Sequence, residues 1–337
     1  MLKQPLLTIK DLCVQFPTDD GLVIAVDGLS LTLGRGRVVG LVGESGCGKT
    51  VTGFSILGLL QTPGRIVGGS ILYTPDGDEV DLASIRPTSE RMRGIRGKEI
   101  AMIFQEPMSS LTPVYTVGDQ IIEAIRAHEQ VTKNAAEDRA IELLKKVGIP
   151  AARDQADSYP HQLSGGMRQR VMIAMALSCS PRLLIADEPT TALDVTVQAQ
   201  IMDLLRARRE ESGLSILMIT HDLGIIADIA DDVVVMYAGV AVEHASVSDL
   251  FAAPQHPYTC GLLSSIPGVG HERGGKLFAI EGSVPDWRNR PVGCLFAPRC
   301  PERFDKCAQR PSLAQVSDGH TVACWARTTA KEDDCAV

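Results

Sequence analysis

The sequence predicts an α/β fold in which a mainly parallel sheet is covered by helices. An apolar run at Val38–Val42 leads through a glycine-rich stretch into an apolar helix from Lys49 to about Leu60, which gives a strand, a loop and a helix. Later in the chain, apolar strands and helical segments alternate, and this alternation is typical of a parallel sheet between helices. The alternating segments are Leu183–Ala186, Val197–Arg209, Ser215–Ile219 and Leu223–Ala230.

An antiparallel β segment is expected before the parallel sheet. Three short β runs, at Leu6–Ile9, Leu22–Val26 and Leu29–Leu33, are interrupted by the turn-forming residues 17–21.

A helical lobe is expected between Ile100 and Pro160. Val117–Ala127 and Ala136–Val147 have the amphipathic spacing of helices that cover a core. Beyond about Leu250 this pattern gives way to Pro- and Gly-rich segments, so we place a domain boundary there.

Composition narrows the class of protein. The formal net charge of −8 argues against a nucleic-acid partner, because phosphate backbones are held mainly by clustered Lys and Arg. The N-terminal residues lack the pattern of a secretory signal, and the apolar runs are too short to span a bilayer, so any membrane association is expected to be peripheral.

Residues 43–50, Gly-Glu-Ser-Gly-Cys-Gly-Lys-Thr, match the phosphate-loop pattern G-x-x-x-x-G-K-[ST]. Glycines let backbone N–H groups turn toward phosphates, and the following helix directs its positive end at them. Lys49 supplies a full positive charge for the outer phosphates, and the Thr50 hydroxyl can bind Mg²⁺. The loop therefore predicts a site for a nucleoside triphosphate, whose residues are Gly43, Glu44, Ser45, Gly46, Cys47, Gly48, Lys49 and Thr50.

A second group of candidate residues ends an apolar strand. Asp187 and Glu188 follow Leu183–Ala186, where buried carboxylates would be costly without a cation or hydrogen bonds. Asp187 is suited to hold Mg²⁺ through water. Glu188 can accept a proton from an attacking water and act as general base.

Leu163-Ser164-Gly165-Gly166-Met167 opens a further long helix, with Ser164 as its expected N-cap. With this segment, the order of motifs resembles the ABC transporter ATPase family, whose signature begins LSGG. The commonest family residue at the position of Met167 is Gln, so we expect altered detail there and retained activity. The resemblance implies that Ser164, Gly165 and Gly166 act on ATP held by a second, partner subunit.

The same resemblance implies further site residues. Gln105, in Ile103-Phe104-Gln105-Glu106-Pro107, resembles the Q-loop glutamine, which senses the nucleotide, lies beside Mg²⁺ and contacts the membrane subunits. Asp194, in Ala192-Leu193-Asp194, resembles the D-loop. His221 resembles the switch histidine, which contacts the γ-phosphate and orients the attacking water. The expected catalytic residues are therefore Glu188, His221 and Gln105.

The family fold implied is a P-loop NTPase cassette. It has a RecA-like parallel sheet core, an N-terminal antiparallel β subdomain and an inserted helical subdomain at about residues 106–165. The ATPase domain would span residues 1–250, and a small irregular C-terminal extension would span residues 251–337. The adenine ring needs an aromatic platform before the phosphate loop, and Phe16 is the candidate, with a core role as its alternative.

The tail resembles one branch of the family. Residues 254–259, Pro-Gln-His-Pro-Tyr-Thr, resemble the segment that marks the ATP-binding subunits of dipeptide and oligopeptide (peptide/nickel) importers, and phrases around Cys294, Cys300 and Cys324 match that branch too. Partners implied are a second ATPase subunit, expected to be a paralogue, two transmembrane permease subunits and an extracytoplasmic solute-binding protein. The expected location is the cytoplasmic face of the bacterial inner membrane. Nickel, glutathione or sugar-like cargo, or a soluble ABC ATPase without a transporter, are the alternatives.

Cys294, Cys300, Cys307 and Cys324 have the spacing C-x5-C-x6-C-x16-C, which suits four thiolates around a metal. The spacing alone leaves zinc, an iron-sulfur cluster and free cysteines open. The family resemblance favours a [4Fe-4S] cluster with a structural role, ordering the Pro/Gly-rich tail.

Overall fold

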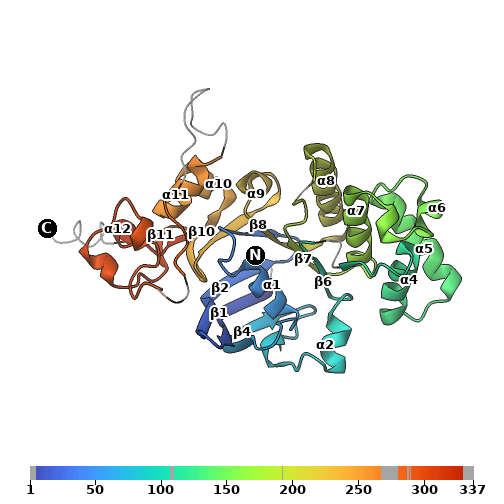
Figure 1. Ribbon diagram of the computed structural model, residues 1–337, viewed down its shortest axis with the longest axis horizontal. Coiled ribbons are helices and arrows are strands. Elements are labelled where there is room, and N and C mark those ends of the chain that lie inside the picture. The colour runs from blue at the N-terminus through green and yellow to red at the C-terminus, as the bar shows by residue number, and fades with distance from the viewer. Residues whose placement is uncertain are drawn as a thin grey trace. The chain divides into compact units, whose positions relative to one another are not determined.

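The computed structural model describes residues 5–106, 110–191, 193–266, 280–286, 288 and 290–328. The chain forms two compact units whose elements are labelled in Figure 1. The first unit contains Met1–Leu6, Gly34–Arg37 and Ile85–Met218, and the second contains Leu7–Leu33, Val38–Ser84 and Ile219–Val337.

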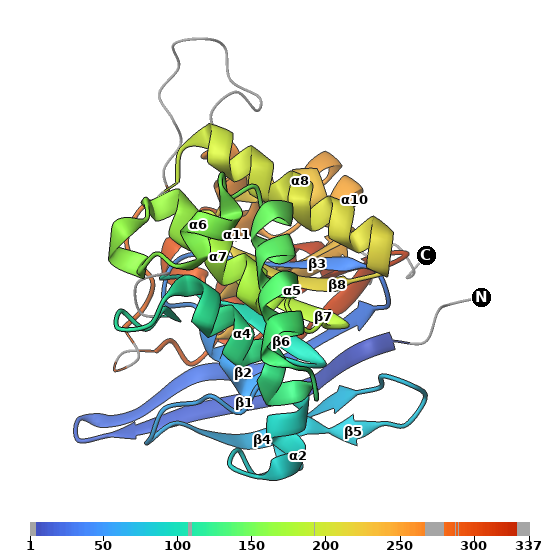
Figure 2. The ribbon, with the colours of Figure 1, turned by 90° about the vertical axis from the view of Figure 1, so that its right-hand side faces the viewer.

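The second unit contains an antiparallel sheet with the strand order β2-β1-β4-β5. Its two longest strands run side by side (Figure 2), where the sequence predicted three short runs. The turn predicted at residues 17–21 is confirmed at residues 19–20, but the strands on either side of it are longer than predicted. Gly28, with a φ of +77°, lies within β2, and Asp11, with a φ of +48°, lies at a register shift of β1, so neither residue ends its strand. The strands are β1 (Pro5–Thr18), β2 (Gly21–Gly34), β4 (Arg65–Tyr73) and β5 (Val80–Asp81).

A second sheet of this unit has the order β11-β12-β10-β9-β3. Every residue of β3 is buried, which explains the unbroken apolar run at this strand. β3 pairs in parallel with β9, whereas the neighbouring pairs from β9 to β11 are antiparallel. The strands are β3 (Val38–Val42), β9 (Asp232–Tyr237), β10 (Val240–Ser246), β11 (Ala314–Ser317) and β12 (His320–Val322).

Short helices complete the second unit. α1 ends sooner than the predicted Leu60, because Gly58 takes a φ of +58° just after the helix. α9 packs on β3 and α10 on β10. The helical elements are η1 (Leu82–Ser84), α1 (Lys49–Ile56), α9 (Leu223–Ile229), α10 (Val247–Ala252), α11 (Pro257–Ser264), η4 (Ala297–Arg299), η5 (Asp305–Ala308) and α12 (Trp325–Thr328).

In the first unit, β7 pairs in parallel with β6 and is flanked on its other side by β8. The strands predicted from Leu183 and Ser215 are confirmed as β7 and β8. β6 is a strand at the start of the segment expected to be helical, and all of its residues are buried. The bounds are β6 (Ile100–Ile103), β7 (Leu183–Asp187) and β8 (Ser215–Thr220).

The helical lobe is confirmed in this unit, where α4, α5, α6 and α7 pack on one another. Thr116, Thr132 and Ser164 cap their helices by accepting a backbone N–H, as helix-start residues do. None of the helices in the described ranges has both the length and the apolar character needed to cross a bilayer. The bounds are α2 (Glu90–Ile95), α4 (Val117–His128), α5 (Lys133–Lys146), α6 (Ala152–Ala156), η2 (Pro160–Gln162), α7 (Gly165–Ala176) and α8 (Val195–Ser212).

Candidate functional site

The phosphate loop joins β3 to α1 in the second unit. Its last glycine, Gly48, is the N-cap of α1 with a φ of +99°, and no side chain caps the helix. The first turn of α1 also contains no acidic residue. The helix therefore presents its N–H groups and positive end without a competing side chain, as anion binding requires.

Close packing explains why two positions of the loop must be glycine. A Cβ at Gly43 would lie 2.2 Å from the carbonyl oxygen of Met236, and one at Gly48 would lie 2.3 Å from that of Ala25. Gly46 also has a positive φ, but a Cβ there would meet nothing within 4 Å. Backbone carbonyl oxygens of β9 and β2 therefore exclude a side chain at the first and last glycines of the loop.

Lys49 is held at the loop by hydrogen bonds. Its side chain is largely buried, and its Nζ donates to the carbonyl oxygens of Gly43 at 2.7 Å and Glu44 at 2.9 Å. Burial raises the pKa of the neighbouring Cys47 thiol above its ordinary value, which favours the neutral thiol. Ser45 and Gly46 are exposed at the tip.

Glu44 is contacted by two residues of the C-terminal region. Its backbone N–H donates to the Tyr258 hydroxyl, and its carboxylate accepts two hydrogen bonds from Arg299. Sequence analysis missed Tyr258 and Arg299 as site residues, although both lie in segments that it singled out. No local signal connects them with a loop more than 200 positions away.

Phe16, the candidate adenine platform, lies half-buried in β1 of the same unit as the loop. Its ring packs against the backbone at Gly64, where a Cβ would lie 2.3 Å from Phe16 Cε1. The adenine contact stays a prediction.

In the first unit, Asp187 is the buried last residue of β7, and Glu188 follows with a φ of +46°. This left-handed conformation is unusual for a residue with a side chain and is often found at functional sites. Gln105 Nε2 donates to Glu188 Oε2 at 3.1 Å, and Thr191 Oγ1 donates to the same oxygen at 2.9 Å. The structure therefore brings the predicted Q-loop residue onto the predicted general base.

The signature segment starts α7, and Ser164 is its N-cap as predicted, accepting from the N–H of Met167 at 3.3 Å. Further along the helix, buried Gln169 donates to the carbonyl oxygen of Pro189 at 2.6 Å. This bond connects the signature helix with the residue next to Glu188, and sequence analysis did not predict it.

Gly166 and Asp194 lie at neighbouring helix starts. A Cβ at Gly166 would lie 3.3 Å from Val197 Cγ1. Asp194 caps α8 by accepting the N–H of Val197 at 2.9 Å, and the adjacent Val195 is 83% exposed. Ala192 of the predicted D-loop and Pro107 of the predicted Q-loop segment lie outside the described residues.

His221 lies in the second unit, exposed, between β8 and α9. The next residue, Asp222, caps α9 by accepting the N–H of Gly224 at 2.7 Å. The strand end and the capped helix start therefore hold the backbone on both sides of His221.

The predicted [4Fe-4S] cluster is wrong, and so is the zinc alternative. Within the described ranges, no group of three or more His, Cys, Asp or Glu side chains is arranged to hold a metal ion. Cys294, Cys300, Cys307 and Cys324 are free, half-buried thiols, and burial raises the pKa of Cys300 to about 11. Their spacing misled because four cysteines can lie in one region without converging on one point.

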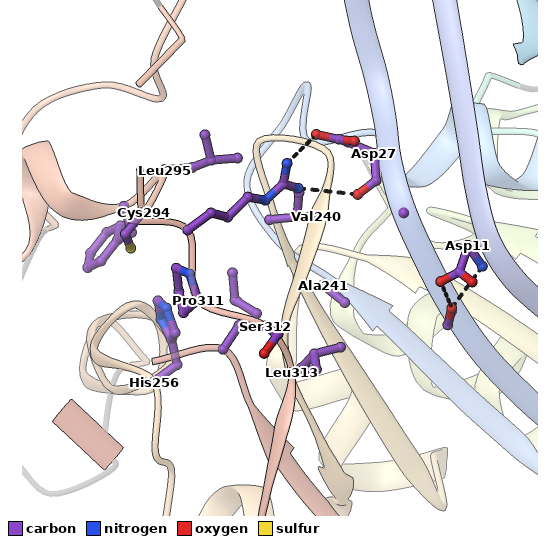
Figure 3. A pocket seen from close by; sticks show the side chains of 16 residues that line it. Asp11, Asp27, Val240, Ala241, His256, Cys294, Leu295, Pro311, Ser312 and Leu313 are labelled. Atoms are coloured by element: carbon purple, nitrogen blue, oxygen red, sulfur yellow. Dashed lines mark hydrogen bonds and ion pairs between the residues drawn. The ribbon is translucent and has the colours of Figure 1, made fainter. Parts of the chain in front are cut away.

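Other interactions order this part of the tail. Arg290 and Arg310 both bind the Asp27 carboxylate, at 2.9 Å and 2.7 Å, and the β11–β12 hairpin extends the sheet at β10. Asp27 and Cys294 both line a cavity of about 460 Å³, shown in Figure 3. Ion pairs and strand pairing thus order this part of the tail, which is the role that was expected of a structural metal.

A glycine-rich loop that starts an uncapped helix, a strand ending in two acids and a second glycine-started helix define an ATP-binding cassette of the ABC type. Comparison with known proteins agrees. Residues 26–191 match the ABC transporter family model, and residues 242–307 match the model of the oligopeptide/dipeptide transporter C-terminal region. The solved dimeric ATP-binding cassette MJ0796, bound to ADP and phosphate, superposes with a TM-score of 0.64 at 25% identity, over 72% of this chain and 98% of that one.

Similarity to whole proteins extends over nearly the full chain. A putative peptide import ATP-binding protein of Brucella melitensis is 52% identical over 332 residues, covering 96% of this chain and 98% of that protein. The oligopeptide transport ATP-binding protein AppD of Bacillus subtilis is 51% identical over 322 residues, covering 95% and 96%. The chain belongs to the ATP-binding subunits of ABC transporters, in the dipeptide/oligopeptide importer family.

Proposed function

We propose that this chain binds and hydrolyses ATP to drive uptake of di- or oligopeptides through a membrane transporter. The observation that carries the proposal is the 52% identity to a putative peptide import ATP-binding protein over 332 residues, which include both the phosphate loop and the C-terminal region. We further propose an ATPase domain at residues 1–250 and a C-terminal extension at 251–337.

In the proposed site, Lys49 and the N–H groups at the start of α1 bind the phosphates, and Phe16 stacks on the adenine. We propose Thr50, Asp187 and Gln105 as the residues that hold Mg²⁺, because hydroxyl, carboxylate and amide oxygens are the donors that this ion prefers. When bound, Mg²⁺ would neutralise charge on the phosphate oxygens.

Hydrolysis in this proposal depends on Glu188 as general base. In the described state Gln105 and Thr191 both donate to one Glu188 oxygen, so that oxygen is oriented but already engaged. Release of Gln105 would free Glu188 to accept the proton of an attacking water, which His221 would help to orient.

A second ATPase subunit is part of the proposal. Ser164, Gly165 and Gly166 would act on ATP bound by that partner, which we expect to be a paralogue, and Asp194 would belong to the D-loop of the nucleotide site. The side chain of Val195, 83% exposed at the start of α8, suits a surface that becomes covered in such a pair.

The proposal also includes membrane partners. Val114 and Tyr115 are 70% and 56% exposed, ten or fewer residues after Gln105, and offer an apolar contact for two permease subunits. A solute-binding protein would then select the cargo, and the chain would sit peripherally at the cytoplasmic face of the inner membrane.

The test is reconstitution in vesicles with a paralogous ATPase subunit, two candidate permease subunits and a candidate solute-binding protein from the same organism. We expect labelled tripeptide uptake that needs ATP, with the Glu188→Gln chain as the inactive control. Uptake of nickel, glutathione or a sugar in place of peptides would overturn the cargo. An ATPase that binds no membrane subunit would overturn the transport role.

A further inference from the structure

Two residues of the C-terminal region, Tyr258 and Arg299, hydrogen-bond to the phosphate-loop residue Glu44. Tyr258, in α11, accepts the Glu44 backbone N–H at 2.8 Å. Arg299, at the end of η4, donates from Nη1 and Nη2 to the two Glu44 carboxylate oxygens at 2.7 Å and 3.0 Å. Backbone and side chain of one loop residue are therefore both held from outside the loop.

The Arg299 side chain is buried, and its N–H groups are taken up by hydrogen bonds at this contact. It is only 4% exposed, and it has five N–H donors. Two go to Glu44, one from Nε goes to the carbonyl oxygen of Glu281 at 2.9 Å, and the others meet Ile280 O and the Tyr237 hydroxyl at 3.3 Å and 3.4 Å. A lysine could not reproduce this fork.

Tyr258 is equally constrained. Its ring is fully buried and lies edge-on to Tyr237 at 4.8 Å and near Phe296 at 5.4 Å between ring centroids. Burial raises the pKa of its hydroxyl well above the ordinary range, so the group stays neutral while it accepts from Glu44. The aromatic cluster thus places one oxygen opposite one loop N–H.

The charge of Glu44 gives these contacts a consequence for the nucleotide. ATP is a polyanion, and an acid in the phosphate loop opposes its binding unless the charge is neutralised. The bidentate Arg299 pair supplies that neutralisation, since charge-assisted pairs of this geometry are the strong ones. Because Arg299 neutralises Glu44, the positive charge of Lys49 remains available to attract the phosphates.

We propose that Tyr258 and Arg299 are positioning residues of the ATP site, through which the C-terminal region sets the affinity of the phosphate loop for nucleotide. The inference rests on the ATP site proposed above. It assigns to the segment matched by the oligopeptide/dipeptide C-terminal model a direct effect on nucleotide binding.

The test is a double-mutant cycle on the isolated full-length chain, with ATP and ADP affinities measured by calorimetric titration. Arg299→Met leaves the Glu44 charge uncompensated, so ATP should bind about tenfold more weakly, and ADP, with less charge, should lose less. Adding Glu44→Gln to Arg299→Met should restore ATP affinity to within about twofold of the wild type, because two neutral side chains then replace the ion pair and the charge beside the phosphates is balanced again.

Arg327→Met is the matched control. Arg327 forms a similar bidentate pair with Glu302 in the same region, and it donates to the carbonyl oxygen of Gln255. Neither of these partners belongs to the phosphate loop. It should leave ATP affinity unchanged. Tyr258→Phe, which keeps the ring and removes the hydroxyl, should weaken ATP binding about threefold by leaving the Glu44 N–H without its acceptor.

Three results would overturn the proposal. They are wild-type affinity in both Arg299→Met and Tyr258→Phe, a double variant as weak as Arg299→Met, and equal losses for ATP and ADP. If Arg299→Met does not fold, Glu44→Gln decides: it leaves the Arg299 charge unpaired beside the loop, so ATP should bind more tightly than to the wild type, and unchanged affinity would overturn the proposal. A wild-type chain that binds no ATP would overturn the proposed function. Normal ATP binding by the wild type, with the same affinity in every variant, would overturn this inference alone.

Discussion

Glu188 carries the clearest chemical expectation of any single residue. In Glu188→Gln the general base is lost while the shape remains, so ATP hydrolysis should fall about 10²–10⁴-fold with ATP affinity little changed. Phosphate release and nucleotide titration on the same preparation measure the two effects. Turnover near the wild-type rate would mean that another group accepts the proton.

Lys49 should behave in the opposite way. Lys49→Ala removes the loop's full positive charge and its hydrogen bonds to Gly43 and Glu44, so ATP affinity itself should fall by more than about tenfold. Lys98→Ala, elsewhere on the chain, serves as a control for loss of one positive charge. Retained affinity in Lys49→Ala would indicate that the phosphates bind elsewhere.

Single residues were predicted from the sequence where a motif is continuous. The phosphate loop, the two acids after β7 and the Ser164 cap each consist of neighbouring positions. The Gln169–Pro189 and Glu44–Arg299 contacts join positions 20 and 255 residues apart, so only folding brings them together. The cysteine spacing failed for the same reason, because separations along the chain do not determine how thiols converge.

At the scale of elements, the loop between β3 and α1 can be tested through its glycines. Gly43→Ala should abolish ATP binding or folding, because the new Cβ would lie 2.2 Å from the Met236 carbonyl oxygen. Gly46→Ala meets no atom within 4 Å and should cost only the strain of its φ of +78°, about 1 kcal/mol. Thermal unfolding and nucleotide titration of both variants make the comparison. Equal effects would contradict the packing argument.

Helices and strands were predicted most reliably from the sequence when they are fully buried or strongly amphipathic. β3 and β7 are buried along their whole length, and α4 has a clear apolar face, so their periodicity is unambiguous. The predicted runs were shorter than β1 and β2, and the runs at Leu22–Val26 and Leu29–Leu33 lie in one strand that continues through Gly28. Such a residue is tolerated inside a strand where a bulge or a left-handed conformation relieves the backbone.

For the folded molecule as a whole, buried His256 predicts a dependence of stability on pH. Burial, with a smaller contribution from the Arg327 charge, lowers the pKa of His256 to about 3 from 6.5, so the folded chain keeps it neutral. Below pH 6.5 the unfolded chain binds a proton that the folded chain does not. Stability is therefore full above that pH and is lost as the pH falls, by about 1.4 kcal/mol per pH unit at most.

His256→Asn tests this, because Asn can still cap α11 but cannot titrate. Urea unfolding between pH 6 and pH 4 should show a shallower loss of stability in this variant than in the wild type. His161→Asn, at an exposed position of η2, should keep the wild-type slope. Parallel curves for His256→Asn and the wild type would show that His256 is protonated in the folded chain.

The hydrogen bonds from Arg299 and Tyr258 to Glu44 also bear on how paralogous subunits can diverge. A C-terminal region whose side chains hydrogen-bond to the phosphate loop cannot be exchanged between proteins as an independent module. A chimaera with the C-terminal region of a paralogue would take from it the residues that contact position 44. If those residues did not fit Glu44, nucleotide affinity would change although no residue of the loop was substituted. Recombination between such genes is then constrained to keep position 44 and its two distant contacts together.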